Sequence, residues 1–316
     1  MAELSAVKEW CEHNGPVFAS ENGFDVIDCQ HCGFKHIIPL PTNEELKGAY
    51  QHDYYSQEKP LYIDRHREDL EWWNLVYGER YEMLEKYLPS HRRRLLDIGS
   101  GPGFFLLNGQ TRCWQVKGIE PSGQASEHSR EVLKLDVVND FFSEKTASDL
   151  GMFDAVNMSE VLEHISDPAN LLKLVSGQIN PGGMLCLVVP NDFNPFQSVL
   201  SEHLGYNSWW VAPPHHINYF DFDSLHKLVE RCGFEVVHKE ATFPIDMFLL
   251  MGDNYVGNDQ VGRACHKKRM NFEKALYLAG LNGLKENLYK AFAEVGLGRE
   301  ITLFARKRDD SKSSII

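Results

Sequence analysis

The segment LLDIGSGPGFF, residues 95–105, places an acid and three glycines directly after a hydrophobic run. Asp97, Gly99, Gly101 and Gly103 follow the spacing D-x-G-x-G-x-G. Glycine inside a strand forfeits packing and costs about 0.5–1 kcal/mol of backbone entropy. The spacing therefore predicts a turn that lets a ligand approach the main chain, and a turn between a strand and a helix N-terminus is typical of a nucleotide-type site.

A second acid, Glu120, stands where the next predicted strand ends, and a carboxylate there accepts both hydroxyls of a ribose. The dinucleotide fingerprint has its third glycine three positions after the second, whereas here position 104 is Phe, so NAD is disfavoured. Asp97 would repel a pyrophosphate but would attract an ammonium group beside the ribose. S-adenosylmethionine carries such a group and is the expected cofactor.

Apolar runs and helical stretches alternate after residue 90, which predicts an α/β, Rossmann-like, doubly wound sheet. Seven strands are expected, at 94–99, 115–120, 135–139, 153–159, 183–190, 234–241 and 299–307. Helices are expected at 167–179, 222–232 and 271–295. Ligands of such sheets bind outside the carboxyl ends of the strands.

The sequence resembles the class I S-adenosylmethionine-dependent methyltransferases in LLDIGSGPGFF, VKGIEPS and FDAVNMSEVLEHISDPANLL…INPGGMLCLVVP. The resemblance covers roughly residues 75–241 and resumes at the last strand. It implies a cofactor site built from Asp97, Gly99, Gly101, Gly103, Glu120, Asn139, Asp140, Phe141 and Ser159. For Asn139 and Asp140 the alternative is a helix cap, and for Phe141 it is a core position.

Methyl transfer is an in-line displacement, so the protein mainly aligns the acceptor and removes its proton, a task that suits histidine. Two stretches supply histidines: SEVLEHISD with His164, and APPHHINYF with His215 and His216. We expect His216 to be the general base, with His215 and Tyr219 orienting the acceptor, and His164 as a second catalytic candidate. The alternative is that these histidines only cap or pack.

The first forty residues contain Cys29-x-x-Cys32-Gly33, the turn of a zinc knuckle. The stretch DCQHCGFKHIIPLPTNEELKGAYQHDYY resembles sugar methyltransferases that carry two cysteine pairs and a tyrosine pair facing the acceptor. Here the first pair reads CEHN, so the expected structural zinc ligands are Cys11, His13, Cys29 and Cys32. The alternative is a module that has lost its metal. The resemblance also offers Tyr54 or Tyr55 as acceptor-facing residues.

Composition limits the partners. The chain of 316 residues has a formal charge of −13, which argues against general binding to nucleic acids or anionic membranes. No apolar run approaches the roughly 20 residues of a membrane span, and no signal-peptide core is evident, so a cytoplasmic location is expected. Seven scattered cysteines do not indicate a disulfide framework in a chain of this size.

The predicted organisation is a zinc-ribbon-like module at 1–41, a helical connecting segment at 42–90, a methyltransferase domain at 91–308 with a substrate lid at 191–220 and a helical insert at 244–298, and a mobile tail at 309–316. The predicted reaction is methyl transfer from S-adenosylmethionine to a hydroxyl, or to a carbon, of a sugar, nucleotide-sugar or other small metabolite, with a role in polysaccharide biosynthesis. The alternatives are a methyltransferase acting on protein or RNA and a non-catalytic S-adenosylmethionine-binding scaffold. The oligomeric state is not predicted.

Overall fold

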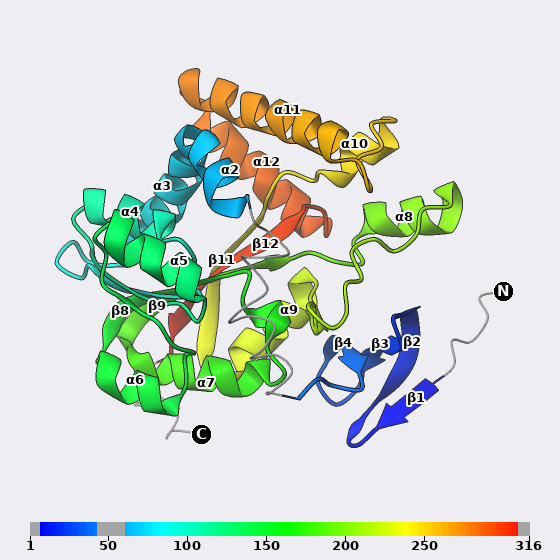
Figure 1. The fold of residues 1–316 in the computed structure, drawn as a ribbon, viewed down its shortest axis with the longest axis horizontal. Helices are drawn as coiled ribbons and strands as arrows, with labels where there is room; N and C mark the ends of the chain where they lie inside the picture. The colour runs from blue at the N-terminus through cyan, green and yellow to red at the C-terminus, as the bar shows by residue number, and fades with distance from the viewer. Residues whose placement is uncertain (1–6, 43–60, 309–316) are drawn as a thin grey trace.

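The computed structural model describes residues 7–42 and 61–308 (Figure 1). Its main feature is a seven-stranded sheet in the order β11-β12-β9-β8-β5-β6-β7. The candidates Tyr54 and Tyr55 and the predicted tail at 309–316 lie outside the described residues.

The strands of the main sheet are β5 (Arg94–Ile98), β6 (Gln115–Ile119), β7 (Val137–Val138), β8 (Phe153–Ser159), β9 (Ile179–Pro190), β11 (Phe234–Ala241) and β12 (Glu300–Lys307). The pairs β5–β6, β5–β8, β6–β7 and β8–β9 are parallel, whereas β12 runs antiparallel to both β9 and β11. The predicted doubly wound sheet is confirmed. Its strand order reverses beside β5, and ligands of open α/β sheets bind at such a switch point.

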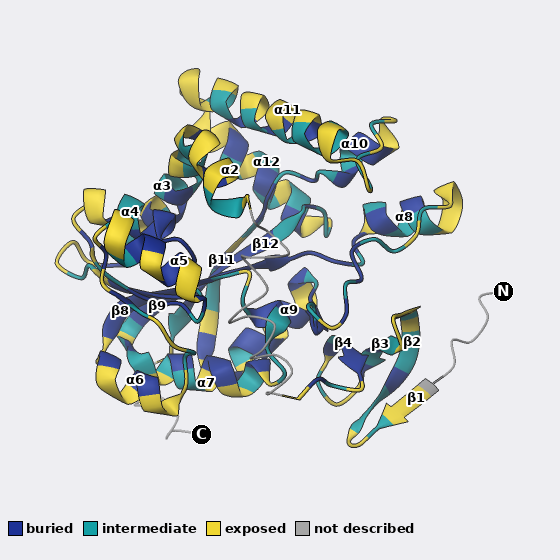
Figure 2. Cartoon of the chain, viewed as in Figure 1, coloured by how far each residue is buried: buried dark blue, intermediate teal, exposed yellow. Residues whose placement is uncertain are grey.

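Helices cover both faces of this sheet because its central strands are apolar on both sides (Figures 1 and 2). On one face, α3 and α4 contribute Tyr81, Leu84 and Phe105 to one core cluster; on the other, α7 and α9 contribute Leu172 and Leu228 to a second. The helices flanking the sheet are α2 (Tyr62–Glu68), α3 (Leu70–Tyr87), α4 (Phe104–Thr111), α5 (Gly123–Glu127), α6 (Glu144–Leu150), α7 (Pro168–Gln178) and α9 (Phe222–Arg231). Within the described ranges no helix combines the length and the apolar character that crossing a bilayer demands.

A second, five-stranded antiparallel sheet contains the N-terminal strands and one strand from far along the chain. Its order is β1 (Val7–Trp10), β2 (His13–Glu21), β3 (Phe24–Cys29), β4 (Phe34–Ile38) and β10 (Asn218–Tyr219). In Figure 1 it lies to one side of the main sheet. Asn218 pairs with His36 and Tyr219 with Lys35, so the predicted lid segment supplies the last strand of the small sheet.

The predicted lid and the predicted insert each contain well-defined helices whose bounds the sequence did not indicate. The lid contains a helix, α8 (Pro195–Leu204), which Asn194 caps by accepting hydrogen bonds from the backbone N–H groups of Phe196 and Gln197. The expected helix at 271–295 is two helices, because the chain turns at Gly280, whose φ is +70°. The insert helices are α10 (Asp246–Leu250), α11 (Asp259–Leu278) and α12 (Asn282–Glu294).

The insert packs over the helices that precede the main sheet. Glu273 of α11 accepts a hydrogen bond from the indole N–H of Trp72 on α3, and Lys285 of α12 forms an ion pair with Glu79. Arg263 forms an ion pair with Asp69, the residue between α2 and α3. The outer surface of α11 is largely exposed (Figure 2). The insert therefore braces α3, which forms one wall of the cavity described next.

Candidate cofactor and acceptor site

A cavity of about 490 Å³ opens at the carboxyl ends of β5, β6 and β8, where the fold predicts a ligand. Of the predicted cofactor residues, six line it: Asp97, Gly99, Gly101, Glu120, Phe141 and Ser159. Of the predicted catalytic residues, His164 lines it, whereas His215, His216 and Tyr219 do not. The structure thus brings the two acids, the glycine turn and one histidine to a single cavity.

Asp97 is held at the end of β5 by its neighbour on β8. The two strands pair Asp97 with Asn157, and the Asn157 side-chain amide donates a hydrogen bond of 2.6 Å to the Asp97 carboxylate. Asp97 is 3% exposed, and this burial raises its pKa to about 7. A cationic group in the cavity would restore the charged form, because an opposite charge favours ionisation.

Glu120 is anchored by the backbone. Its two carboxylate oxygens accept hydrogen bonds of 2.8 Å from the N–H groups of Gly101 and Ser122. Burial raises the pKa of Glu120 to about 7 despite these bonds. Each carboxylate oxygen has a second lone pair, so the group keeps acceptor capacity for two ligand hydroxyls.

The glycine turn borders the cavity and also packs closely against neighbouring elements. Gly99 has a φ of +72°, and a Cβ there would lie 2.5 Å from Cγ2 of Val161. Gly103 begins α4 in the left-handed region, and a Cβ there would lie 2.7 Å from the Ser129 hydroxyl. Gly103 faces this packing contact and does not line the cavity, whereas Gly99 and Gly101 do line it.

Asn139 and Asp140 also stand back from the cavity wall. The Asn139 amide donates to the carbonyl oxygens of Glu120 and Pro121, and the Asp140 carboxylate accepts from the N–H of Phe141. These bonds fix the end of β6 and the segment after β7, and so place Phe141 at the cavity. The sequence could not separate these supporting residues from those that line the site.

One wall of the cavity was not predicted from the sequence. Trp73, Tyr77 and Arg80 of α3 line it, together with His66 of α2, whose ring stacks on Trp73 with centroids 4.7 Å apart. Arg80 is buried, and its guanidinium donates to the hydroxyl of Ser159 at 3.3 Å. The signal was present, since positions 73, 77 and 80 share one face of a helix.

His164 is fixed by the loop that precedes β10. Its Nδ1 donates to the carbonyl oxygen of His215 at 2.7 Å, so Nε2 is left as the proton-accepting nitrogen. Nε2 lies 3.6 Å from the carboxyl group of Glu163, which is 1% exposed. The ring of His216 packs edge-on against His164, with centroids 5.0 Å apart.

Tyr219 is placed in a different environment from the one predicted. It is 2% exposed and belongs to a core cluster with Trp210 and Ile217. Its hydroxyl donates to the carbonyl oxygen of His216 and accepts from the N–H of Ala212. Tyr219 therefore holds the backbone of the loop that carries His215 and His216 (the histidine loop), and its side chain does not line the cavity.

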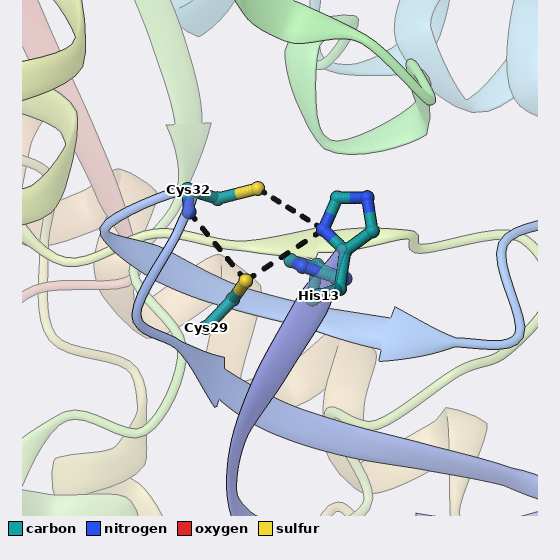
Figure 3. Close-up of side chains that lie close together, drawn as sticks. His13, Cys29 and Cys32 are labelled. Carbon is teal, nitrogen blue, oxygen red and sulfur yellow. Dashed lines mark hydrogen bonds between the residues drawn. The ribbon is translucent and has the colours of Figure 1, made fainter. Parts of the chain in front are cut away.

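The predicted metal ligands are only partly brought together. Nδ1 of His13 lies 3.6 Å from the sulfur of Cys29 and 3.4 Å from that of Cys32 (Figure 3). Cys11 does not join them: it stands in the turn between β1 and β2 with a φ of +53° and is exposed. The fourth residue of the group is His36 of β4, which the sequence analysis did not single out.

Comparison with known proteins agrees with this geometry. The family described as "Methyltransferase domain" matches residues 70–239. The ubiquinone biosynthesis O-methyltransferase of Escherichia coli (strain K12) is 30% identical over 151 residues, which cover 40% of this chain and 63% of that protein. The match thus spans less than two thirds of the relative's own length. The chain belongs to the methyltransferase domain family, in the S-adenosylmethionine-dependent class.

Solved structures with a similar arrangement include a SAM-dependent methyltransferase from Archaeoglobus fulgidus, with a TM-score of 0.48 and 18% identity over 74% of this chain and 93% of that one. A phosphoethanolamine N-methyltransferase 2 from Haemonchus contortus in complex with S-adenosyl-L-methionine has a TM-score of 0.48 and 13% identity, over 92% of this chain and 71% of that one.

Proposed function

We propose that this protein transfers the methyl group of S-adenosylmethionine to a hydroxyl group of a small metabolite, with sugars and nucleotide-sugars as the first class to test. The observation that carries the proposal is the presence of Asp97, Glu120 and His164 on the wall of one cavity. The two carboxylates can bind a methyl donor that carries a positive charge and a ribose. The imidazole can accept the proton that leaves the acceptor hydroxyl. The O-methyltransferase relative supports oxygen as the methylated atom.

The charge on the cavity wall matches the amino-acid end of this cofactor. Asp97 offers an anion for its ammonium group, and Arg80 is the single Lys or Arg side chain among the described lining residues. We assign Arg80 to the cofactor's carboxylate, because a buried guanidinium and a carboxylate form charge-assisted hydrogen bonds. Glu120 then holds the ribose, and the aromatic ring of Phe141 lies at the adenine end.

We assign the proton-accepting role to His164 and not to His216, because His164 lines the cavity. When Nε2 of His164 takes the acceptor's proton, the Glu163 carboxyl group 3.6 Å away stabilises the imidazolium that forms. His216 packs against the ring of His164 and keeps its orientation. The methyl group moves from sulfur to the acceptor oxygen as the proton leaves that oxygen, so the products are the methyl ether and S-adenosylhomocysteine.

The test is transfer of label from methyl-labelled S-adenosylmethionine to a panel of nucleotide-sugars and other hydroxylated metabolites. His164→Ala is expected to lower kcat by about 10²–10⁴-fold, the usual contribution of a general base, with the cofactor Kd unchanged in calorimetry. His216→Ala is expected to lower kcat less. Full activity of His164→Ala would overturn the assignment, and cofactor binding without transfer to any acceptor would support the non-catalytic scaffold.

A further inference from the structure

The group formed by His13, Cys29, Cys32 and His36 lies outside the cavity described above. The ligand atoms of these four residues lie within 4.8 Å of one another. They come from three strands and one turn of the small sheet: His13 from β2, Cys29 from the end of β3, Cys32 from the turn, and His36 from β4. Two sulfurs and two imidazole nitrogens are the donor set of a Cys₂His₂ zinc site.

The distances within the group match the edges of a zinc tetrahedron. Bonds of about 2.3 Å to sulfur and about 2.0 Å to nitrogen place a ligating nitrogen and sulfur about 3.5 Å apart. The observed separations from Nδ1 of His13 are 3.6 Å to Cys29 and 3.4 Å to Cys32, and Figure 3 shows both sulfurs facing the ring nitrogen. The three side chains are therefore already arranged around a common point.

His36 supplies the decisive observation. Its side chain is 1% exposed, and Nδ1 donates to the carbonyl oxygen of Ile37 at 2.9 Å. That bond fixes the proton on Nδ1 and leaves Nε2 with its lone pair, and metal-ligating histidines are usually oriented in this way. Nε2 of His36 is buried and has no hydrogen-bond partner among the residues that the structure describes. A buried polar atom without a partner destabilises the folded state, and a metal ion bound at this nitrogen would remove that penalty.

We propose that His13, Cys29, Cys32 and His36 bind one structural Zn²⁺, and that the ion holds the small sheet in the geometry that positions the histidine loop of the methyltransferase domain. Four protein ligands leave no open coordination position, so the ion is structural and not catalytic. Cys11, which the sequence offered as a ligand, is left out because it occupies an exposed turn.

The path from the metal site to the histidines is short. His36 pairs with Asn218 across the β4–β10 ladder, and the N–H of Ile37 donates to the carbonyl oxygen of Ile217 at 2.9 Å. The Asn218 amide donates to the carbonyl oxygens of Leu162 and Ile165, on either side of the Glu163–His164 pair. This second part of the proposal rests on the proposed role of His164, whereas the metal site itself does not.

The first experiment measures the metal content of the full chain, purified without a histidine tag and reconstituted with Zn²⁺. One Zn²⁺ per chain is expected for the wild type and for Cys11→Ser, and a loss of most of it for His36→Ala and Cys32→Ser. Calorimetric binding of S-adenosylmethionine shows that each variant retains the folded main sheet. A wild type that takes up no Zn²⁺, or zinc lost from Cys11→Ser and kept in His36→Ala, would overturn the ligand set.

A second variant keeps the site testable if His36→Ala fails to fold. His36→Cys would give three thiolates and one imidazole, which also bind zinc in a tetrahedron. After Co²⁺ substitution, the thiolate-to-cobalt charge-transfer band is expected to strengthen by about half in this variant, because three thiolates replace two. An unchanged band would exclude position 36 from the coordination sphere.

Hydrogen exchange tests the structural link without relying on catalysis. Removing the metal with a chelator is expected to accelerate amide exchange in peptides that cover β4 and β10, while peptides that cover β5 and β6 keep their protection. If the β10 peptide keeps its protection after zinc has been removed, the ion does not position the histidine loop. A failed transfer assay alongside the expected exchange pattern would count against the proposed function only.

Discussion

Two buried carboxyl groups set the chemistry of the cofactor site. Burial raises the pKa of both Asp97 and Glu120 to about 7, above the value near 4 that an exposed carboxyl has. Without a ligand, the folded state holds these protons between about pH 4 and 7, so their contribution to stability is greatest below pH 4 and is lost as the pH rises through 7. A ligand that brings an ammonium group to Asp97 and hydroxyl donors to Glu120 reverses this preference, because both interactions favour the ionised carboxylates.

We therefore expect the affinity for S-adenosylmethionine to increase as the pH rises from about 5.5 to 7, by up to about tenfold per pH unit for each carboxyl that loses its proton, and to level off above the pKa. Isothermal titration calorimetry across this range measures the slope. Glu120→Gln removes one titrating group, so its slope is expected to be smaller than that of the wild type. An affinity independent of pH in the wild type would show that neither carboxyl is protonated in the free protein.

At the scale of one element, the start of α4 joins the ligand turn to the rest of the sheet. Gly103 is the last residue before the helix, has a φ of +88°, and lies against Ser129 and Leu135. A side chain at this position has to adopt a left-handed backbone conformation and also displace the neighbouring layer. The third glycine of the motif therefore secures the packing of α4, while the first two border the cavity.

Gly103→Ala is accordingly expected to lower the free energy of unfolding by about 1–3 kcal/mol, since strain and overpacking each cost about that much. Gly123→Ala is the matched control, because Gly123 begins α5 and a Cβ there would meet no atom of the described parts of the chain within 4 Å. Urea denaturation followed by circular dichroism measures both. Equal stability of the two variants would contradict the packing role of Gly103.

At the scale of the whole molecule, the helical insert and the small five-stranded sheet position the walls of the cavity. The insert braces α3 through the contacts of Glu273 and Lys285, and α3 carries Trp73, Tyr77 and Arg80. The small sheet reaches the opposite side through β10 and Asn218. In the proposed function the main sheet provides the cofactor end of the site, and the insert and the small sheet shape the remainder.

A substitution of Asn218 tests whether β10 supports the acceptor side of the site and not the cofactor side. Its buried amide donates to two carbonyl oxygens, and Asn218→Ala leaves both without this donor, at a cost of about 1–3 kcal/mol for each group. The variant is expected to lower kcat for methyl transfer and to retain the affinity for S-adenosylmethionine. Asn108→Ala, which removes a half-buried amide on α4 that donates to Asn74 of α3, is expected to leave both unchanged. A weakened cofactor affinity with a normal kcat would contradict the assignment of β10 to the acceptor side.

Much of the fold could be predicted because its signals are local. β8 and β11 occupy the predicted residues 153–159 and 234–241, and Asp97 and Glu120 stand at the predicted strand ends. The helix α8 was missed although its signals were in the sequence: Asn194 and Gln197 form a capping box and Gly205 ends the helix. The predicted lid at 191–220 is long and rich in aromatic residues, and these features concealed the helical pattern.

The sequence alone determined which residues form the strands, where the glycine turn lies and which acids stand at the strand ends, because strand periodicity and turn conformation depend on neighbouring residues. Only the tertiary structure decided that His164 and not His216 lines the cavity, and that His36 and not Cys11 joins His13. These choices depend on the pairing of β4 with β10, residues 34–38 with 218–219. A hydrogen-bonded contact between such distant segments forms only when the whole chain folds, so no local pattern records it.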